Sequence, residues 1–116
     1  RRRFFAKDYL GTHVDGIASG RVTEFKCPIA GLYDDVPPHY MAQVQGQMYL
    51  ADLTECHFVA WTPDELRIWK VARSDEYVSW MLPMLDEFWS MVQKDIEPPR
   101  LKRKPKPVEV KTERVL

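Results

Sequence analysis

The pattern of apolar and polar positions predicts two pairs of β-strands. Residues 4–18 and 21–27 are rich in aromatic and β-branched side chains and flank Ser19-Gly20, a two-residue turn of the hairpin type. Residues 55–61 and 66–72 form a second predicted pair, joined by a tight turn that contains a proline. The predicted strands therefore come as two sequence-adjacent pairs.

A helix is predicted between these pairs, over residues 39–52. Its apolar stripe recurs at intervals of three or four residues and consists of Met41, Val44, Met48 and Ala51. A second stripe, polar and aromatic, consists of Tyr40, Gln43 and Gln47. Because the two stripes lie on different faces of the helix, we expect the second to lie off the core.

The C-terminal part of the chain divides into a long helix and a tail. Residues 75–94 predict the longest helix, which Pro83 is expected to kink or split. Residues 95–116 contain four prolines and seven basic residues, which indicate an extended, flexible tail and not a packed element. The order strand-strand-helix-strand-strand-helix predicts a mixed α/β, or α+β, fold with one domain over residues 1–94.

Composition narrows the class of protein. With 116 residues, 45% of them hydrophobic, the chain can bury a core. The net charge is zero, so a nucleic-acid site would have to rely on local features or on bound cations. Two cysteines and no apolar run of roughly 20 residues favour the cytoplasm over a secreted or membrane setting. Because the chain starts at Arg1 and not at Met, we expect a fragment or a processed piece.

The candidate chemistry lies in the first strand pair. Glu24 and Lys26 share a face of their strand, and Asp15 lies across the turn, close enough to share a cation with Glu24. Two carboxylates and a backbone carbonyl form a hard oxygen site that suits Mg²⁺ or Mn²⁺. Such an ion activates water and stabilises charge on a phosphate, and Lys26 beside it could orient the water. The alternative is a solvated strand face with an ordinary cross-strand ion pair.

Two longer stretches carry a resemblance to a known family. The stretch HVDGIASGRVTEFKCP resembles the PDG…E-(I/L/F)-K-C-P core of the lambda exonuclease and YqaJ-like branch of the PD-(D/E)xK nucleases. Further on, HYMAQVQGQMYLADLTECHFVAW resembles that family's Y-x-x-Q-x-Q-x-x-M helix and the aromatic strand after it. Both occur in the family's order, and together they cover about residues 9–92. The resemblance implies a restriction-endonuclease-like core, with a central mixed sheet flanked by helices.

The resemblance also implies residue roles. Asp15, Glu24 and the carbonyl of Phe25 would be the metal ligands, Lys26 the catalytic lysine, and Gln43 a catalytic glutamine. Tyr40 and Gln47 of the same helix stripe would contact DNA. Val14 stands where the family often has proline. The family also draws a further acid and a phosphate-binding group from helices that precede its first strand, which we do not find here.

The function that follows is Mg²⁺-dependent hydrolysis of DNA, as an exonuclease on linear double-stranded DNA in recombination or end processing. The resemblance adds a single-strand annealing protein as partner, a homotrimer, and the host cytoplasm if a phage encodes the chain. The basic residues of the tail, Lys102, Arg103 and Lys104, could contact DNA phosphates or act as a localisation signal. A merely solubilising tail is the alternative for these residues. The alternative is a non-catalytic nucleic-acid-binding module with the same fold.

The histidines, cysteines and tryptophans are the remaining candidates for zinc binding, nucleophilic catalysis and base stacking. The histidines and cysteines (His13, His39, His57, Cys27 and Cys56) match no zinc spacing, and nothing marks an activated cysteine nucleophile. The four tryptophans (Trp61, Trp69, Trp80 and Trp89) could stack on bases. Because they alternate with apolar residues, we expect them to pack in the core instead.

Overall fold

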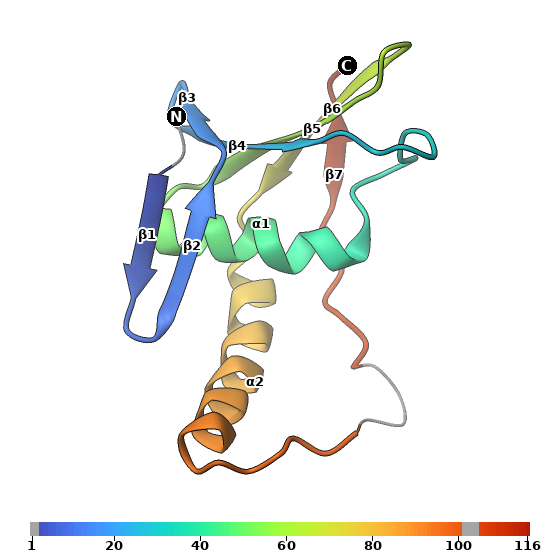
Figure 1. Ribbon diagram of the computed structural model, residues 1–116. Helices are drawn as coiled ribbons and strands as arrows, with labels where there is room; N and C mark the ends of the chain where they lie inside the picture. Colours follow the sequence, from blue (N-terminus) through green and yellow to red (C-terminus); the bar gives the residue numbers. More distant parts are fainter. Residues whose placement is uncertain (1–2, 101–104) are drawn as a thin grey trace.

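The protein is built on a five-stranded sheet, with one helix packed across its inner face and a two-stranded hairpin beside that helix (Figure 1). The computed structural model describes residues 3–100 and 105–116. In chain order the elements are β1 (Arg3–Lys7), β2 (Leu10–Val14), β3 (Gly16–Ala18), β4 (Arg21–Lys26), α1 (Pro38–Ala51), β5 (Glu55–Trp61), β6 (Leu66–Ala72), α2 (Asp75–Gln93) and β7 (Thr112–Arg114). The strand order in the sheet is β3-β4-β5-β6-β7. The predicted mixed α and β class is confirmed.

The N-terminal segment turns back on itself, so the prediction of one strand over residues 4–18 is wrong. β1 and β2 pair antiparallel, and Asp8 between them has a φ of 54°. Aspartate tolerates this left-handed conformation better than most side chains, so it allows a tight turn within a run of strand-like residues. A bend at Asp15 then separates β2 from β3. Asp15 therefore lies at the junction between the hairpin and the sheet.

The turn between β3 and β4 has the predicted form. Ser19 and Gly20 have φ values of 52° and 72°, and two successive left-handed residues are the geometry of a type I′ hairpin turn. The pairing of β3 with β4 extends only as far as Gly16 and Thr23. β4 runs on to Lys26, so its last three residues continue past the end of β3.

The central strands form one parallel and several antiparallel pairs. β4 pairs parallel with β5, and the chain between them crosses over through α1. β5 and β6 have the bounds predicted from the sequence, and they pair antiparallel along their whole length. The carboxyl ends of the parallel pair lie at Lys26 and Trp61.

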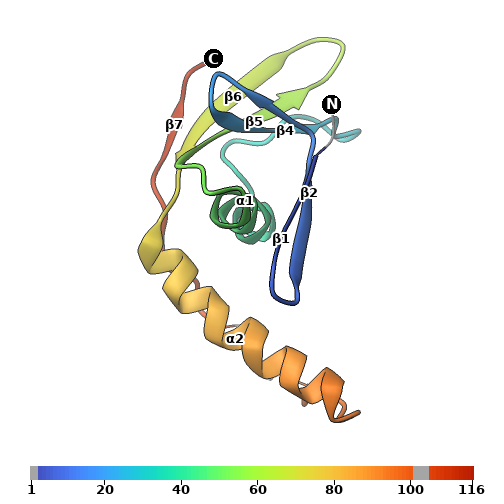
Figure 2. The same ribbon diagram turned by 90° about the vertical axis from the view of Figure 1, so that its left-hand side faces the viewer.

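The core lies between the inner face of the sheet and α1. The core cluster includes, from the sheet, Val22, Cys56, Phe58, Ala60, Trp69 and Val71, and, from α1, Met41, Val44 and Met48. The hairpin of β1 and β2 contacts α1 from a second side. α1 is therefore covered by the sheet and by the hairpin, as Figure 2 shows in a view along the helix.

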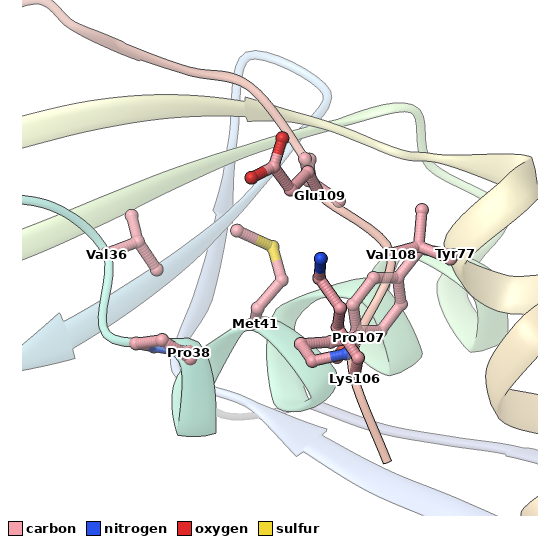
Figure 3. Close-up of a pocket in the computed structure, with 9 residues that line it drawn as sticks. Val36, Pro38, Met41, Tyr77, Lys106, Pro107, Val108 and Glu109 are labelled. Atoms are coloured by element: carbon pink, nitrogen blue, oxygen red, sulfur yellow. The ribbon is translucent and has the colours of Figure 1, made fainter.

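The last part of the predicted tail is packed, so the expectation of a wholly extended tail is wrong. β7 pairs antiparallel with β6, and Val108 and Val110 pack against the core. Residues 106–110 close one side of a cavity of about 290 Å³ next to Val36, Met41 and Tyr77 (Figure 3). Valines alternate with charged residues here, which is the pattern of a short strand. The prolines before it favoured the prediction of an unpacked tail instead.

α2 begins against the core and then leads away from it (Figure 2). The Ser74 hydroxyl caps the helix by accepting a hydrogen bond from the Tyr77 amide at 3.0 Å. The helix continues through Pro83, so the proline does not split it. Its buried residues, Tyr77, Val78 and Met81, all lie in the first two turns. Among the described residues, no helix is both long enough and apolar enough to cross a bilayer.

The packing of the C-terminal segment predicts a measurable stability. Replacing Val108 and Val110 together by alanine should lower the free energy of unfolding by about 1–2 kcal/mol, because partly buried methyl groups are lost from the core. Val115→Ala is the matched control, because Val115 is exposed and should change stability by less than about 0.5 kcal/mol. Urea denaturation measures both. Equal midpoints for the double variant and the control would contradict this packing.

Candidate functional site

β4 and α1 bring four polar side chains together on the inner side of the sheet. β4 directs Val22, Glu24 and Lys26 toward α1, because alternate residues of a strand share a face. Gln43 and Gln47 are one helical turn apart, so they meet β4 from the same side of α1. Glu24 is only 4% exposed and lies at the centre of the group.

Both oxygens of the Glu24 carboxylate have a hydrogen-bond donor. Oε1 accepts from Nε2 of Gln43 at 3.1 Å, and Oε2 accepts from Nε2 of Gln47 at 2.8 Å. The Lys26 ammonium lies 3.2 Å from Oε1. A buried carboxylate without partners is strongly destabilising, so these three groups are what allow Glu24 to lie in the interior.

Lys26 is held from three sides. Its Nζ donates to Oε1 of Gln43 at 3.3 Å and lies 4.3 Å from the ring centroid of Tyr40. The Gln43 amide therefore bridges Lys26 and Glu24, with its oxygen on one and its nitrogen on the other. The Tyr40 ring adds a cation–π contact to the ammonium. The acid and the base of the predicted motif form one connected network with the helix.

Gln47 is a positioning residue, and its predicted contact with DNA is wrong. Its side chain is fully buried, and Nε2 donates both to Glu24 and to the backbone carbonyl of His13, the latter at 3.1 Å. The hairpin of β1 and β2 covers this side of α1, which the helical pattern alone does not reveal. Oε1 of Gln47 is buried and has no hydrogen-bond partner among the residues that the structure describes, and reversing the amide would aim this oxygen at Glu24.

Asp15 lies at the edge of β4. Its Oδ2 accepts a hydrogen bond from the Phe25 amide at 2.9 Å. The pairing of Gly16 with Thr23, extended by one residue, places Asp15 opposite Glu24. In a strand the N–H and C=O of one residue point to the same side. The carbonyl of Phe25 is therefore directed toward the Asp15 side of β4.

The oxygen atoms of Asp15, Glu24 and the Phe25 backbone are the candidate ligands for a divalent metal ion. Two carboxylates and the Phe25 carbonyl are oxygen donors, which suit a hard cation and not a soft one. Within residues 3–100 and 105–116, no group of three His, Cys, Asp or Glu side chains gathers as a metal site. Mg²⁺ commonly uses one or two carboxylates and keeps several waters or phosphate oxygens. The donor types match such a partly hydrated ion and not a closed protein cage, whereas in this structure both Glu24 oxygens accept hydrogen bonds from Gln43 and Gln47.

The other sequence predictions have separate outcomes. Lys102, Arg103 and Lys104 lie outside the described residues. Trp69 is a core residue as expected, whereas Trp61 is half exposed, so core packing is wrong for it.

The sequence pattern also did not reveal Gln45. Its buried amide donates to the Ala72 carbonyl at 3.0 Å and accepts from the Ser74 amide at 2.8 Å, which ties α1 to the start of α2.

Comparison of the chain with family models, with curated proteins and with solved structures finds no match in any of the three.

The role of Gln47 can be measured as an interaction energy. Gln47→Met keeps the volume but leaves Glu24 Oε2 without its donor, so it should lower the free energy of unfolding by about 2–3 kcal/mol. In a Glu24→Gln background the same change should cost clearly less, because the charge is gone. A double-mutant cycle by urea denaturation gives the difference. Equal costs in the two backgrounds would show that Gln47 does not act through the carboxylate.

The two cysteines should differ in reactivity. Burial, with Glu24 as a smaller cause, raises the pKa of the Cys56 thiol to about 12, whereas Cys27 is exposed. Because the thiolate is the reactive form, Cys56 should stay unreactive in the folded chain up to about pH 9. A thiol-exchange reagent should label Cys27 alone in buffer, and both residues in denaturant. Cys27→Ser should then remove the native-state signal, and residual rapid labelling would contradict the burial of Cys56.

Proposed function

We propose that this chain is the core of a metal-dependent DNA nuclease with a restriction-endonuclease-like fold. One observation carries the proposal. The carboxylate of Glu24, the ammonium of Lys26 and the amide of Gln43 lie within hydrogen-bond distance of one another. Asp15 is at the strand edge beside them. These residues come from β4, from α1 and from the junction before β3, and they are the residues that the resemblance to lambda-exonuclease-like nucleases singles out.

The proposed chemistry is hydrolysis of a phosphodiester bond. Asp15, Glu24 and the Phe25 carbonyl would hold Mg²⁺ or Mn²⁺, which when bound supplies Lewis acidity and a water of lowered pKa. Lys26 then has a positive charge next to the site, where it can orient the attacking water or stabilise charge on the phosphate. Gln43 holds Lys26 and Glu24 at a defined separation. Gln47 keeps the Glu24 side chain in place through its hydrogen bond to Oε2.

The proposed substrate is linear double-stranded DNA, digested from an end during recombination or end processing. This assignment, a single-strand annealing protein as partner and assembly into a trimer rest on the family resemblance. The residues of the site support the reaction class, because a hard cation with an adjacent lysine matches the charge that develops on a phosphate.

A second candidate is a non-catalytic nucleic-acid-binding module with the same fold. It is favoured by the small number of acids in the site, since the part of the chain that is described contains no cluster of three metal-ligating side chains. In that case Lys26 and Glu24 would form a structural ion pair. Binding of DNA without cleavage in Mn²⁺ would identify it.

The nuclease proposal is tested with end-labelled linear duplex DNA in Mg²⁺ or Mn²⁺. Lys26→Ala should reduce cleavage by at least about 100-fold, because the positive charge at the phosphate is lost. Gln43→Ala should reduce it by about 10- to 100-fold through misplacement of Lys26. Lys70→Ala is the matched control, because Lys70 is on β6, which β5 separates from β4, and it pairs with Glu55 on the other face of the sheet.

Several outcomes separate the candidates. EDTA should stop cleavage, and thermal unfolding should show that Lys26→Ala is still folded. Cleavage by Lys26→Ala at the wild-type rate would remove Lys26 from the site. Intact DNA with the wild-type chain in both metals, together with DNA binding, would favour the binding module.

A further inference from the structure

The outer face of the sheet presents an apolar surface next to the candidate site. Phe25 of β4, Val59 and Trp61 of β5, and Leu66 and Ile68 of β6 lie on this face, because they alternate with the residues directed toward α1. Both helices lie on the opposite side of the sheet (Figures 1 and 2). No described helix covers this surface.

Two aromatic rings are the most exposed part of this surface. The exposed fraction is 54% for Phe25 and 50% for Trp61, whereas Val59 between them is 8% exposed. Phe25 and Trp61 lie outside the aromatic cluster of the core, in which Tyr33 and Tyr40 pack around Phe58. A contiguous apolar patch on a protein surface often marks an interaction site. The position of Phe25 and Trp61 next to the candidate site indicates which class of ligand this surface binds.

The pairing of β4 with β5 sets how far apart Phe25 and Trp61 lie on the outer face. Phe25 is directly opposite Val59, so Trp61 is its diagonal neighbour two residues further along β5. Neighbouring strands are roughly 4.8 Å apart and rise roughly 3.3 Å per residue, so the Cα atoms of such diagonal neighbours are about 8 Å apart. The two aromatic side chains are therefore neighbours on the outer face of the sheet.

An open groove continues from this surface. It has a volume of about 500 Å³ and is lined by residues 27–31, which follow β4, and by residues 61–64, which follow β5. Trp61 belongs to both the groove and the outer surface. Among the described residues that line the groove, Asp64 is the charged one, so they offer no positive charge to hold a phosphate. It suits a flat ligand that is not itself an anion.

The same strand links this surface to the candidate site. Phe25 lies between Glu24 and Lys26, with its side chain on one face of β4 and theirs on the other. β4 continues past the end of its pairing with β3, so the two faces meet at the edge marked by Asp15. A nucleic-acid strand with a phosphate at Lys26 can therefore place its next bases over this edge, near Phe25.

We propose that Phe25 and Trp61 form a stacking site for unpaired nucleobases of a single-stranded DNA end, and that the groove receives the bases that follow. The ligand class rests on the proposed function of the adjacent site. Stacking on aromatic rings does not depend on the base, because every base has a π-face. The phosphates then remain at the edge near Lys26, and the uncharged groove holds the bases.

The test is DNA binding in EDTA, where no hydrolysis occurs. A duplex with a short single-stranded overhang should bind the full chain more tightly than the blunt duplex. Phe25→Ala and Trp61→Ala should each weaken binding of the overhang duplex by roughly 5- to 100-fold, and Trp61→Ala should leave the blunt duplex unchanged. Phe88→Ala is the matched control, because Phe88 is 53% exposed on α2, far along the chain from this surface. It should change neither affinity.

A conservative variant distinguishes base stacking from general hydrophobic contact. Phe25→Leu keeps an apolar side chain but removes the π-face, so it should lose affinity as Phe25→Ala does. An overhang with abasic positions should bind as weakly as the blunt duplex. In addition, the overhang duplex should slow thiol labelling of Cys27 in the groove, which requires no substitution at all.

Other results would overturn the proposal. Equal affinity for overhang and blunt duplexes, or wild-type affinity of Phe25→Leu for the overhang, would remove the stacking site. Self-association of the chain that Trp61→Ala abolishes would instead identify the outer face as an interface between copies.

Comparison with the cleavage assay separates this inference from the proposed function. Cleavage without an overhang preference would overturn the stacking site alone. An overhang preference that depends on Phe25 and Trp61, without cleavage in Mg²⁺ or Mn²⁺, would sustain the stacking site and overturn the nuclease.

Discussion

The buried carboxylate of Glu24 is the constraint on which the rest of the structure depends. A charge in the interior needs donors at every side, and Gln43, Gln47 and Lys26 supply them. Gln47 also reaches the His13 carbonyl, so the same interaction joins β4, α1 and β2. Rotation of α1 by one residue would remove both amides from the carboxylate. The polar network therefore determines how the helix sits on the sheet, which apolar packing alone would leave less specific.

The two faces of the sheet also differ from each other. The inner face buries the core and ends in the polar network, whereas the outer face carries exposed aromatic rings. Parallel strands are usually covered on both faces, so a face of the parallel pair of β4 and β5 that no described helix covers is a natural place for a ligand. Both the network and the groove lie toward the carboxyl ends of these strands, where open sheets that contain parallel strands commonly bind ligands. The polar network and the exposed aromatic rings therefore lie on the two faces of the same end of β4.

Local patterns account for the parts of the fold that were predicted correctly. β5 and β6 match their predicted bounds, and α1 is displaced by one residue, because alternation and helical periodicity are properties of short segments. The Ser19-Gly20 turn was predictable for the same reason. The break at Asp8 was missed because an aspartate in a left-handed turn interrupts a strand without changing its hydrophobic pattern. β7 was missed because a short edge strand gains its stability from its partner β6, which lies more than 40 residues earlier in the chain.

The sequence by itself determined that Glu24 and Lys26 share a face, that Asp15 lies across the hairpin from them, and that Tyr40 and Gln43 share a helix stripe. Each of these follows from the period of one element or from one turn. Only the tertiary structure decided that α1 lies over β4, that Gln47 is buried beneath the hairpin and that Phe25 and Trp61 are exposed together. These relations depend on which faces meet when separate elements pack. Burial is a property of that assembly, so no single segment of the chain could encode it.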